Sequence, residues 1–138
     1  MSPDRPITLV IADDNSGTRT LLRTLARRDG RFEIVGEAAD GLDAVAVTRE
    51  AQPDAILLDI MMPVVNGLEA IPDILEVAAR TRIVCYSAYE GYRDEAMDLG
   101  AHGWCTKGWP WSEVAAAVIR LVGGREGVAA KRSDRESG

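Results

Sequence analysis

The chain has 138 residues, 46% of them hydrophobic and 28% charged, with a formal net charge of −6. This length suits one domain with its own core, and the ordinary composition excludes a wholly disordered chain. No apolar run approaches the roughly 18 residues of a membrane span, no export signal opens the chain, and the acidic balance argues against direct nucleic-acid binding, so we expect a cytoplasmic protein.

The first part of the chain holds two short apolar runs, each followed by a helical pattern. The runs at 7–11 and 32–35 are rich in β-branched residues, which is typical of buried strands in a parallel sheet. After each run, apolar residues repeat at helical spacing and predict a helix with one buried stripe. The predicted stripes are Thr18, Leu21, Leu22 and Leu25 in the first helix and Leu42, Val45 and Ala46 in the second.

The rest of the chain repeats this order three times. Apolar runs at 55–58, 82–86 and 103–106 predict strands. We expect Ser112 to cap the last helix and Gly123-Gly124 to end it. Pro72 should either kink the third helix or lie in its first turn. The predicted stripes are Leu68, Ile71 and Leu75, then Ala96 and Leu99, then Val114, Val118, Leu121 and Val122.

Five alternations of strand and helix predict an α/β fold in which a doubly wound parallel sheet carries helices on both faces. The composition changes near Gly124, after which the chain is polar and aperiodic. We therefore assign residues 1–123 to the domain and 124–138 to a polar tail, which we expect to be disordered.

Polar residues follow directly after four of the predicted strands. Asp13 and Asp14 follow the first strand, Asp59 the third, Ser87 the fourth and Lys107 the fifth. In open α/β sheets, ligands bind outside the carboxyl ends of the strands, so we expect these side chains to converge. Lys107 is also the only lysine before the polar tail.

These residue types suit phosphoryl chemistry when they occur together. Clustered carboxylates favour a hard cation such as Mg²⁺, and a carboxylate can attack phosphorus to give an aspartyl-phosphate. A lysine and a hydroxyl can then hold the phosphoryl oxygens. Each residue alone has an ordinary explanation as a loop, turn or strand-end residue, but their conjunction at one sheet edge favours the functional interpretation.

Longer stretches around these residues resemble the receiver domain of two-component response regulators. The resemblance covers about residues 7–122, and its most specific part is the Asp-x-x-Met-Pro-x-x-Asn-Gly pattern that begins at Asp59. It implies a flavodoxin-like (βα)5 fold with a five-stranded sheet in the order 2-1-3-4-5. Gly108 stands where many receivers place a proline after a cis bond, which is closer to receivers linked to helix-turn-helix output domains.

The resemblance also implies an acceptor and a metal site. Asp59 would be the phosphoacceptor. Asp13, Asp14, Asp59 and the backbone carbonyl of Met61 would hold Mg²⁺, with Asp13 acting largely through water.

A conformational switch is implied as well. Ser87 would move towards the phosphoryl group, Lys107 would pair with that group, and Trp104 occupies the position of the switch aromatic. Because an indole is larger than the usual tyrosine or phenylalanine, we expect Trp104 to shift inward only in part. Trp104, Trp109 and Trp111 either pack in the core and loops or form an exposed patch for a partner.

Three other reactive side chains have ordinary interpretations. Cys85 and Cys105 are too few for a disulfide framework or a zinc cluster, and we expect two free, buried thiols on adjacent strands. His102 is the only histidine of the chain, and we expect a surface loop residue there.

The implied function is a phosphorylation-dependent signalling domain and not an enzyme, beyond self-phosphorylation from small donors and slow self-dephosphorylation. A histidine kinase or a histidine phosphotransfer protein would supply the phosphoryl group. The response would be binding of a downstream protein, or homodimerisation, through the face of the fourth helix, fifth strand and fifth helix. The domain itself would contact neither nucleic acid nor membrane.

Three alternatives stay open. The chain could be a receiver fragment of a DNA-binding response regulator, or a receiver-like interaction module that works without phosphorylation. A phosphatase with an aspartate nucleophile has similar chemistry, but such enzymes typically carry a second acid two residues after the nucleophile. Met61 stands there in this chain, which argues against a phosphatase.

Overall fold

Five parallel strands form one sheet in the order β2-β1-β3-β4-β5 within residues 5–123, the part of the chain that the computed structural model describes. The proposed polar tail, 124–138, lies outside the described residues. The strands are β1 (Ile7–Ala12), β2 (Phe32–Ala38), β3 (Ala55–Leu58), β4 (Arg82–Ser87) and β5 (Gly103–Thr106). The helices are α1 (Ser16–Asp29), α2 (Gly41–Ala51), α3 (Gly67–Val77), α4 (Arg93–Leu99) and α5 (Trp111–Gly123), with a short 3₁₀ turn, η1 (Glu90–Tyr92), before α4.

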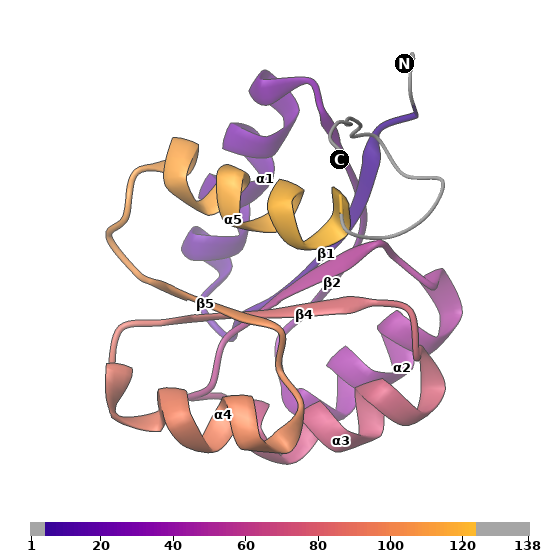
Figure 1. Cartoon of the computed structure of the whole chain (residues 1–138), viewed down its shortest axis with the longest axis vertical. Helices are drawn as coiled ribbons and strands as arrows, with labels where there is room; N and C mark the ends of the chain where they lie inside the picture. The colour runs from indigo at the N-terminus through magenta and orange to yellow at the C-terminus, as the bar shows by residue number, and fades with distance from the viewer. Residues whose placement is uncertain (1–4, 124–138) are drawn as a thin grey trace, which may run out of the picture.

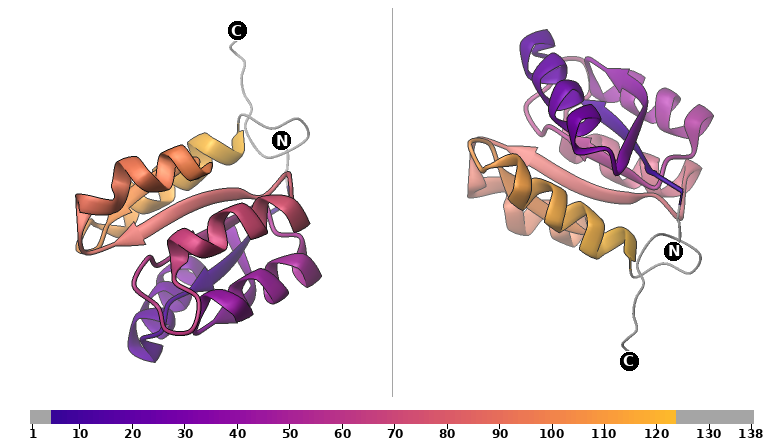
Figure 2. Two further views of the ribbon diagram at one scale, coloured as in Figure 1. Left: turned by 90° about the horizontal axis from the view of Figure 1, so that it is seen from below. Right: turned by 90° about the horizontal axis from the view of Figure 1, so that it is seen from above.

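The helices cover both faces of the sheet, as the predicted doubly wound fold requires. Helices α1 and α5 lie on one face and α2, α3 and α4 on the other (Figures 1 and 2). None of the helices in this region is long and apolar enough to cross a bilayer. The predicted fold class and strand order are confirmed.

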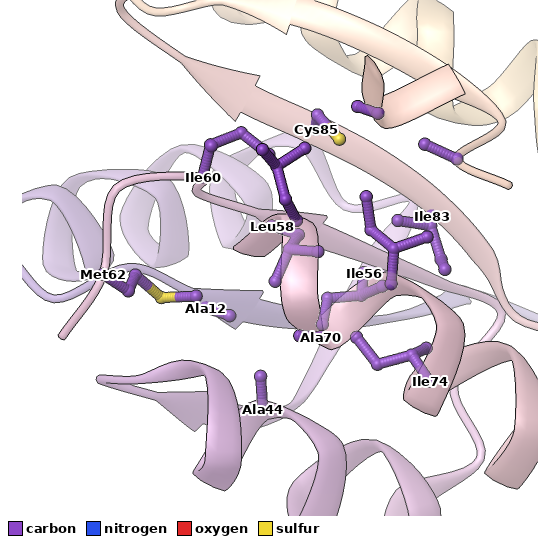
Figure 3. Close-up of a cluster of buried hydrophobic side chains, with 14 of the residues drawn as sticks. Ala12, Ala44, Ile56, Leu58, Ile60, Met62, Ala70, Ile74, Ile83 and Cys85 are labelled. Carbon is purple, nitrogen blue, oxygen red and sulfur yellow. The ribbon is translucent and has the colours of Figure 1, made fainter. Parts of the chain in front are cut away.

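Strand side chains alternate between two buried clusters, one on each face of the sheet. Leu9, Leu57 and Val84 pack with α1 and α5 in what we call the α1–α5 cluster. Val10 and Ile83 point the other way, into the α2–α4 cluster, part of which Figure 3 shows. Because both faces are covered, the strands read in the sequence as nearly continuous apolar runs.

Strand positions match the predictions closely. The strands at 55–58 and 103–106 have the predicted bounds, and the other three extend further, to Ala12, Ala38 and Ser87. These extensions carry the sheet up to the polar residues that follow it.

Helix starts were harder to predict from the sequence. The prediction that Ser112 caps α5 is wrong, because the helix begins at Trp111 and the carbonyl of Pro110 accepts from the backbone N–H of Glu113 and Val114. A late start of α3 at Pro72 is also wrong. Asn66 and Glu69 form a reciprocal capping box that starts α3 at Gly67, so Pro72 lies inside the helix.

The predicted buried stripe of α2 is wrong at Leu42 and Ala46, which are exposed, whereas Val45 is partly buried and packs against the α2–α4 cluster. Leu42 is 62% exposed, whereas the residues that α2 buries are Gly41, Ala44 and Thr48. A Cβ on Gly41 would lie 1.9 Å from the carbonyl oxygen of Val65 in the loop before α3. The helix therefore buries its small side, because its start lies too close to that loop for a side chain. In α1, similarly, Leu22 and Ala26 are buried while Leu21 is exposed.

Candidate functional site

The backbone pairing of the sheet continues past the strand ends and holds the predicted site residues. The N–H of Asp13 donates to the carbonyl of Ala38, and the N–H of Asp59 donates to the carbonyl of Ala12, both at 2.9 Å. The N–H of Lys107 donates to the carbonyl of Ser87 at the same distance. The side chains at this edge are therefore placed by the rigid sheet.

Three carboxylates meet at this edge. One oxygen from each of Asp13, Asp14 and Asp59 lies within 4.8 Å of the others. Asp13 and Asp59 are buried and Asp14 is exposed, so the cluster has one side open to solvent. Oxygen donors in this number, with a side open for water ligands, fit Mg²⁺, which binds to a few carboxylates and keeps several waters.

Burial and crowding raise the pKa of Asp59. Removal from water is the largest cause, the negative charge of Asp13 adds to it, and the charge of Lys107 opposes both. A cation in the cluster would relieve the repulsion between the two buried carboxylates. The electrostatics of the site thus favour a bound cation.

Lys107 already supplies one positive charge there. Its Nζ lies 2.8 Å from Oδ2 of Asp13 and 3.3 Å from Oδ2 of Asp59, and 5.8 Å from the centre of the Tyr86 ring. Burial lowers the pKa of Lys107, but the hydrogen bonds and charges of the two aspartates outweigh it and the pKa is raised. Lys107 therefore stays protonated beside the acids.

The loop between β3 and α3 turns tightly around Asp59. The N–H of Met61 donates to Oδ1 of Asp59 at 3.3 Å, and the N–H of Gly67 donates to the carbonyl of Ile60 at 2.8 Å. A Cβ on Gly67 would lie 2.2 Å from the carbonyl oxygen of Asp59, so only glycine fits this position. No role for Gly67 was predicted from the sequence, although Asn66-Gly67 ends the pattern that begins at Asp59.

Ser87 ends β4 at the edge of the cluster. It is buried, and its Oγ accepts a hydrogen bond from the N–H of Tyr89 at 3.3 Å. The structure thus brings together Asp13, Asp14, Asp59 and Lys107 by direct contact or close approach, and places Ser87 beside Lys107 through the backbone.

Arg19 contacts the site, although its sequence position predicted no role there. Its Nη1 donates to the backbone carbonyl of Asp13 at 2.6 Å. The sequence signal was weak, because arginines spaced along the polar side of α1 are typical of a solvated helix face.

The three tryptophans do not form one patch. Trp104 is only 7% exposed and packs in the α2–α4 cluster, so the indole is already buried in this state, and its partial shift on phosphorylation stays a prediction. Trp111 packs edge-on against Phe32 in the α1–α5 cluster, and its Nε1 donates to Asp29. Of the three, only Trp109 is substantially exposed, at 39%. Trp104 and Trp111 therefore lie on opposite faces of the sheet.

Both cysteines are free and buried, as predicted. Cys85 points into the α2–α4 cluster and Cys105 into the α1–α5 cluster, so the sheet lies between the two thiols. Burial raises the pKa of Cys85 to about 12 and that of Cys105 to about 11.

His102 is more than the surface loop residue that we expected. It is half-buried, and its ring Nδ1 accepts a hydrogen bond from the backbone N–H of Ile83 at 2.9 Å. The backbone N–H of His102 donates in turn to the carbonyl of Ile83 at 2.8 Å. It therefore joins the start of β4 to the segment before β5.

Comparison with known proteins gives consistent matches. The sequence profile of the response regulator receiver domain family matches residues 9–119. The chain is 35% identical to the chemotaxis protein CheY of Halobacterium salinarum over 116 residues, which is 83% of this chain and 95% of CheY. Some relatives are longer: the match to the transcriptional regulatory protein DesR of Bacillus subtilis spans 60% of that protein.

Solved structures agree with the sequence matches. A two-component response regulator of the LuxR family from Aurantimonas sp. is 28% identical, with a TM-score of 0.81 over 94% of this chain and 91% of that one. The receiver domain of the sensor histidine kinase PA1611 from Pseudomonas aeruginosa is 25% identical, with a TM-score of 0.77 over 86% of this chain and 98% of that one. That structure holds a magnesium ion in its active-site cleft.

Proposed function

Because the chain belongs to the response regulator receiver domain family, we propose that it is a signalling domain that accepts a phosphoryl group on Asp59. One observation carries the proposal above the others. The buried carboxylate of Asp59 lies within 4.8 Å of two further carboxylates, with the ammonium of Lys107 3.3 Å from its Oδ2. A nucleophile, a cation site and a fixed positive charge thus share one sheet edge.

The proposed reaction is a direct phosphoryl transfer. A carboxylate oxygen of Asp59 attacks the phosphorus, an O–P bond forms, and the bond from phosphorus to the donor's imidazole nitrogen or small leaving group breaks. Lys107 offsets the negative charge of the phosphoryl oxygens, and the hydroxyl of Ser87 donates a hydrogen bond to one of them. Asp13, Asp14, Asp59 and the carbonyl of Met61 would hold Mg²⁺, which supplies charge neutralisation when bound.

We expect the phosphoryl group to be long-lived. Met61 and Tyr89, each two residues beyond a site residue, are 58% and 61% exposed at the rim. Neither side chain is a base or a carboxamide that could orient a water molecule for in-line attack. Self-dephosphorylation should therefore be slow, and the proposed role is that of a switch and not of an enzyme.

Partners follow from the same proposal. A histidine kinase or a histidine phosphotransfer protein in the cytoplasm donates the phosphoryl group. Movement of Ser87, followed by repacking of Trp104 on β5, changes the face made by α4, β5 and α5. That face then binds a downstream protein or a second copy of the chain.

The alternatives fit the site less well. An interaction module that works without phosphorylation would have no use for buried carboxylates beside a lysine, since their burial is costly. A phosphatase would need an acid where Met61 stands. A role within a longer DNA-binding regulator is compatible with the site, and the match to the transcriptional regulatory protein DesR, of which this chain spans only 60%, supports it.

Intact mass spectrometry tests the proposal. With Mg²⁺ and a small phosphodonor, the mass of the protein should rise by about 80 Da, the mass of one phosphoryl group. Asp59→Asn should abolish the increase, because an amide is no nucleophile, while Asp73→Asn, which changes an exposed aspartate on α3, should not. Equal labelling of the wild type and Asp59→Asn would refute the assignment.

A further inference from the structure

The loop between β1 and α1 carries two of the three clustered carboxylates on adjacent residues. Asp13 and Asp14 are joined by a single peptide group, whose oxygen is the backbone carbonyl of Asp13. A peptide group is planar, so fixing its oxygen also fixes how the backbone of both residues is turned. Whatever holds that oxygen affects both carboxylates.

Arg19 holds it. From the first turns of α1, Nη1 of Arg19 donates to the carbonyl of Asp13 at 2.6 Å. The same guanidinium is anchored from the neighbouring strand, because its Nε donates to Oε1 of Glu37 on β2 at 3.3 Å. Both side chains are largely sheltered, with 20% and 27% of their surfaces exposed, so solvent competes little for these bonds.

The other contacts of the loop leave this peptide for Arg19 to fix. The N–H of Asp13 is held by the carbonyl of Ala38, and its Oδ1 accepts from the N–H of Asn15 at 2.9 Å. These bonds hold the N–H and the carboxylate of Asp13, and neither of them involves its backbone carbonyl. Asp14 is exposed, and the peptide that precedes it is turned by the bond to Arg19.

We propose that Arg19 is a positioning residue for the cation site: anchored by Glu37, it orients the Asp13–Asp14 peptide so that both carboxylates face the cation. The inference rests on the proposed function in one respect, the binding of Mg²⁺ by the acidic cluster. It adds a residue that never touches the cation and carries the same sign of charge.

That sign makes the test sharp. By charge alone, removing an arginine near an acidic cluster should strengthen cation binding. If Arg19 positions the loop, its removal should weaken binding instead. Arg23 is a matched control, because its Nη1 also donates to Glu37, to Oε2 at 2.5 Å, and the contacts of its side chain do not include the carbonyl of Asp13.

The experiment is calorimetric titration of Mg²⁺ into the unphosphorylated chain and its variants. Arg19→Gln should raise the dissociation constant about tenfold or more, the usual effect of losing a group that orients a metal ligand. Arg23→Gln should leave it unchanged or lower it. The midpoint temperature of unfolding in EDTA should change equally in Arg19→Gln and Arg23→Gln. If Arg19 were purely structural, its removal would lower this temperature together with the affinity for Mg²⁺.

Each outcome decides something. Binding by Arg19→Gln that is as tight as wild type, or tighter, overturns the inference while leaving the proposed function standing. Equal weakening in both variants also overturns it, because both remove a partner of Glu37. A wild type that binds no Mg²⁺ refutes the cation site and the inference with it. If Arg19→Gln does not fold, Arg19→Lys replaces it: a single ammonium cannot span both partners as the fork does, so wild-type affinity there contradicts the inference.

Discussion

A single side chain, Lys107, offsets part of the negative charge of the site. It lies between two buried carboxylates, which repel each other and would otherwise share a poorly solvated edge of the sheet. The raised pKa of Asp59 shows that the compensation is incomplete, because burial and the charge of Asp13 outweigh the lysine. Without a cation, the crowding of these carboxylates is therefore electrostatically unfavourable.

Removal of this lysine should expose the repulsion. Lys107→Met should lower the free energy of unfolding in EDTA by about 1–3 kcal/mol, because it leaves two buried carboxylates without their partner. Denaturant unfolding of the variant gives the value. The double variant Lys107→Met/Asp13→Asn should recover part of the loss, since only one buried carboxylate remains; a double variant no more stable than Lys107→Met would show that the lysine acts otherwise.

Contacts between elements stabilise the domain away from the site. Trp111 at the start of α5 packs edge-on against Phe32, with ring centres 5.4 Å apart, and its Nε1 donates to Oδ2 of Asp29 at 2.9 Å. Asp29 ends α1 and also accepts from Arg31. One tryptophan thus joins the beginning of α5 to the end of α1 and the beginning of β2.

Trp111→Phe keeps the ring contact and removes the hydrogen bond. It should lower the free energy of unfolding by about 1 kcal/mol, measured by denaturant unfolding. Trp109→Phe, on the exposed ring nearby, is the control and should change it by less than about 0.5 kcal/mol. Equal effects would mean that the bond to Asp29 contributes nothing.

The hydrogen bonds between His102 and Ile83, which join β4 to the segment before β5, should make the stability of the fold depend on pH. Burial, with a smaller effect of the Arg82 charge, lowers the pKa of His102 in the folded state. The unfolded chain then binds a proton more readily than the folded one. The contribution of neutral His102 to the free energy of unfolding is therefore fully present above its unfolded pKa of about 6.5, and it is lost as the pH falls towards its pKa in the folded state. Protonation also removes the acceptor at Nδ1 that Ile83 uses.

His102→Asn tests this dependence. An asparagine oxygen can take the place of Nδ1 as the acceptor, and it does not titrate in this range. The free energy of unfolding should therefore fall less between about pH 7 and about pH 5.5 in the variant than in the wild type. Parallel curves for the two proteins would exclude His102 as the cause.

Across the whole molecule, the buried strands could be predicted well from the sequence. Contacts made with the backbone of another segment could not. Runs such as 55–58 show their burial by composition alone, and the carboxyl-end rule then brought Asp59 and Lys107 together. The buried face of α2 was missed because a small residue, Gly41, packs there against backbone, which no apolar pattern records. The bond from Arg19 to Asp13 was missed because a long side chain reached back to a main-chain oxygen.

Cation binding should stabilise the whole domain. Mg²⁺ that binds only the folded state should raise the free energy of unfolding by about 2.7 kcal/mol at a hundredfold excess over its dissociation constant. Asp14→Asn should reduce the gain at the same Mg²⁺ concentration while leaving the protein folded, because it removes one anionic ligand. Asp98→Asn, on the exposed side of α4, should retain the full gain. Thermal unfolding with and without Mg²⁺ measures both.

The sheet also divides the interior into two layers, and each layer contains one buried thiol. Cys85 lies on the α2–α4 side and Cys105 on the α1–α5 side. With pKa values of about 12 and about 11, neither forms a thiolate readily while it is enclosed. Alkylation must then wait for the layer around each sulfur to open. The two thiols therefore report on local opening of the two layers. The order in which an alkylating reagent modifies them shows which side of the sheet opens more often.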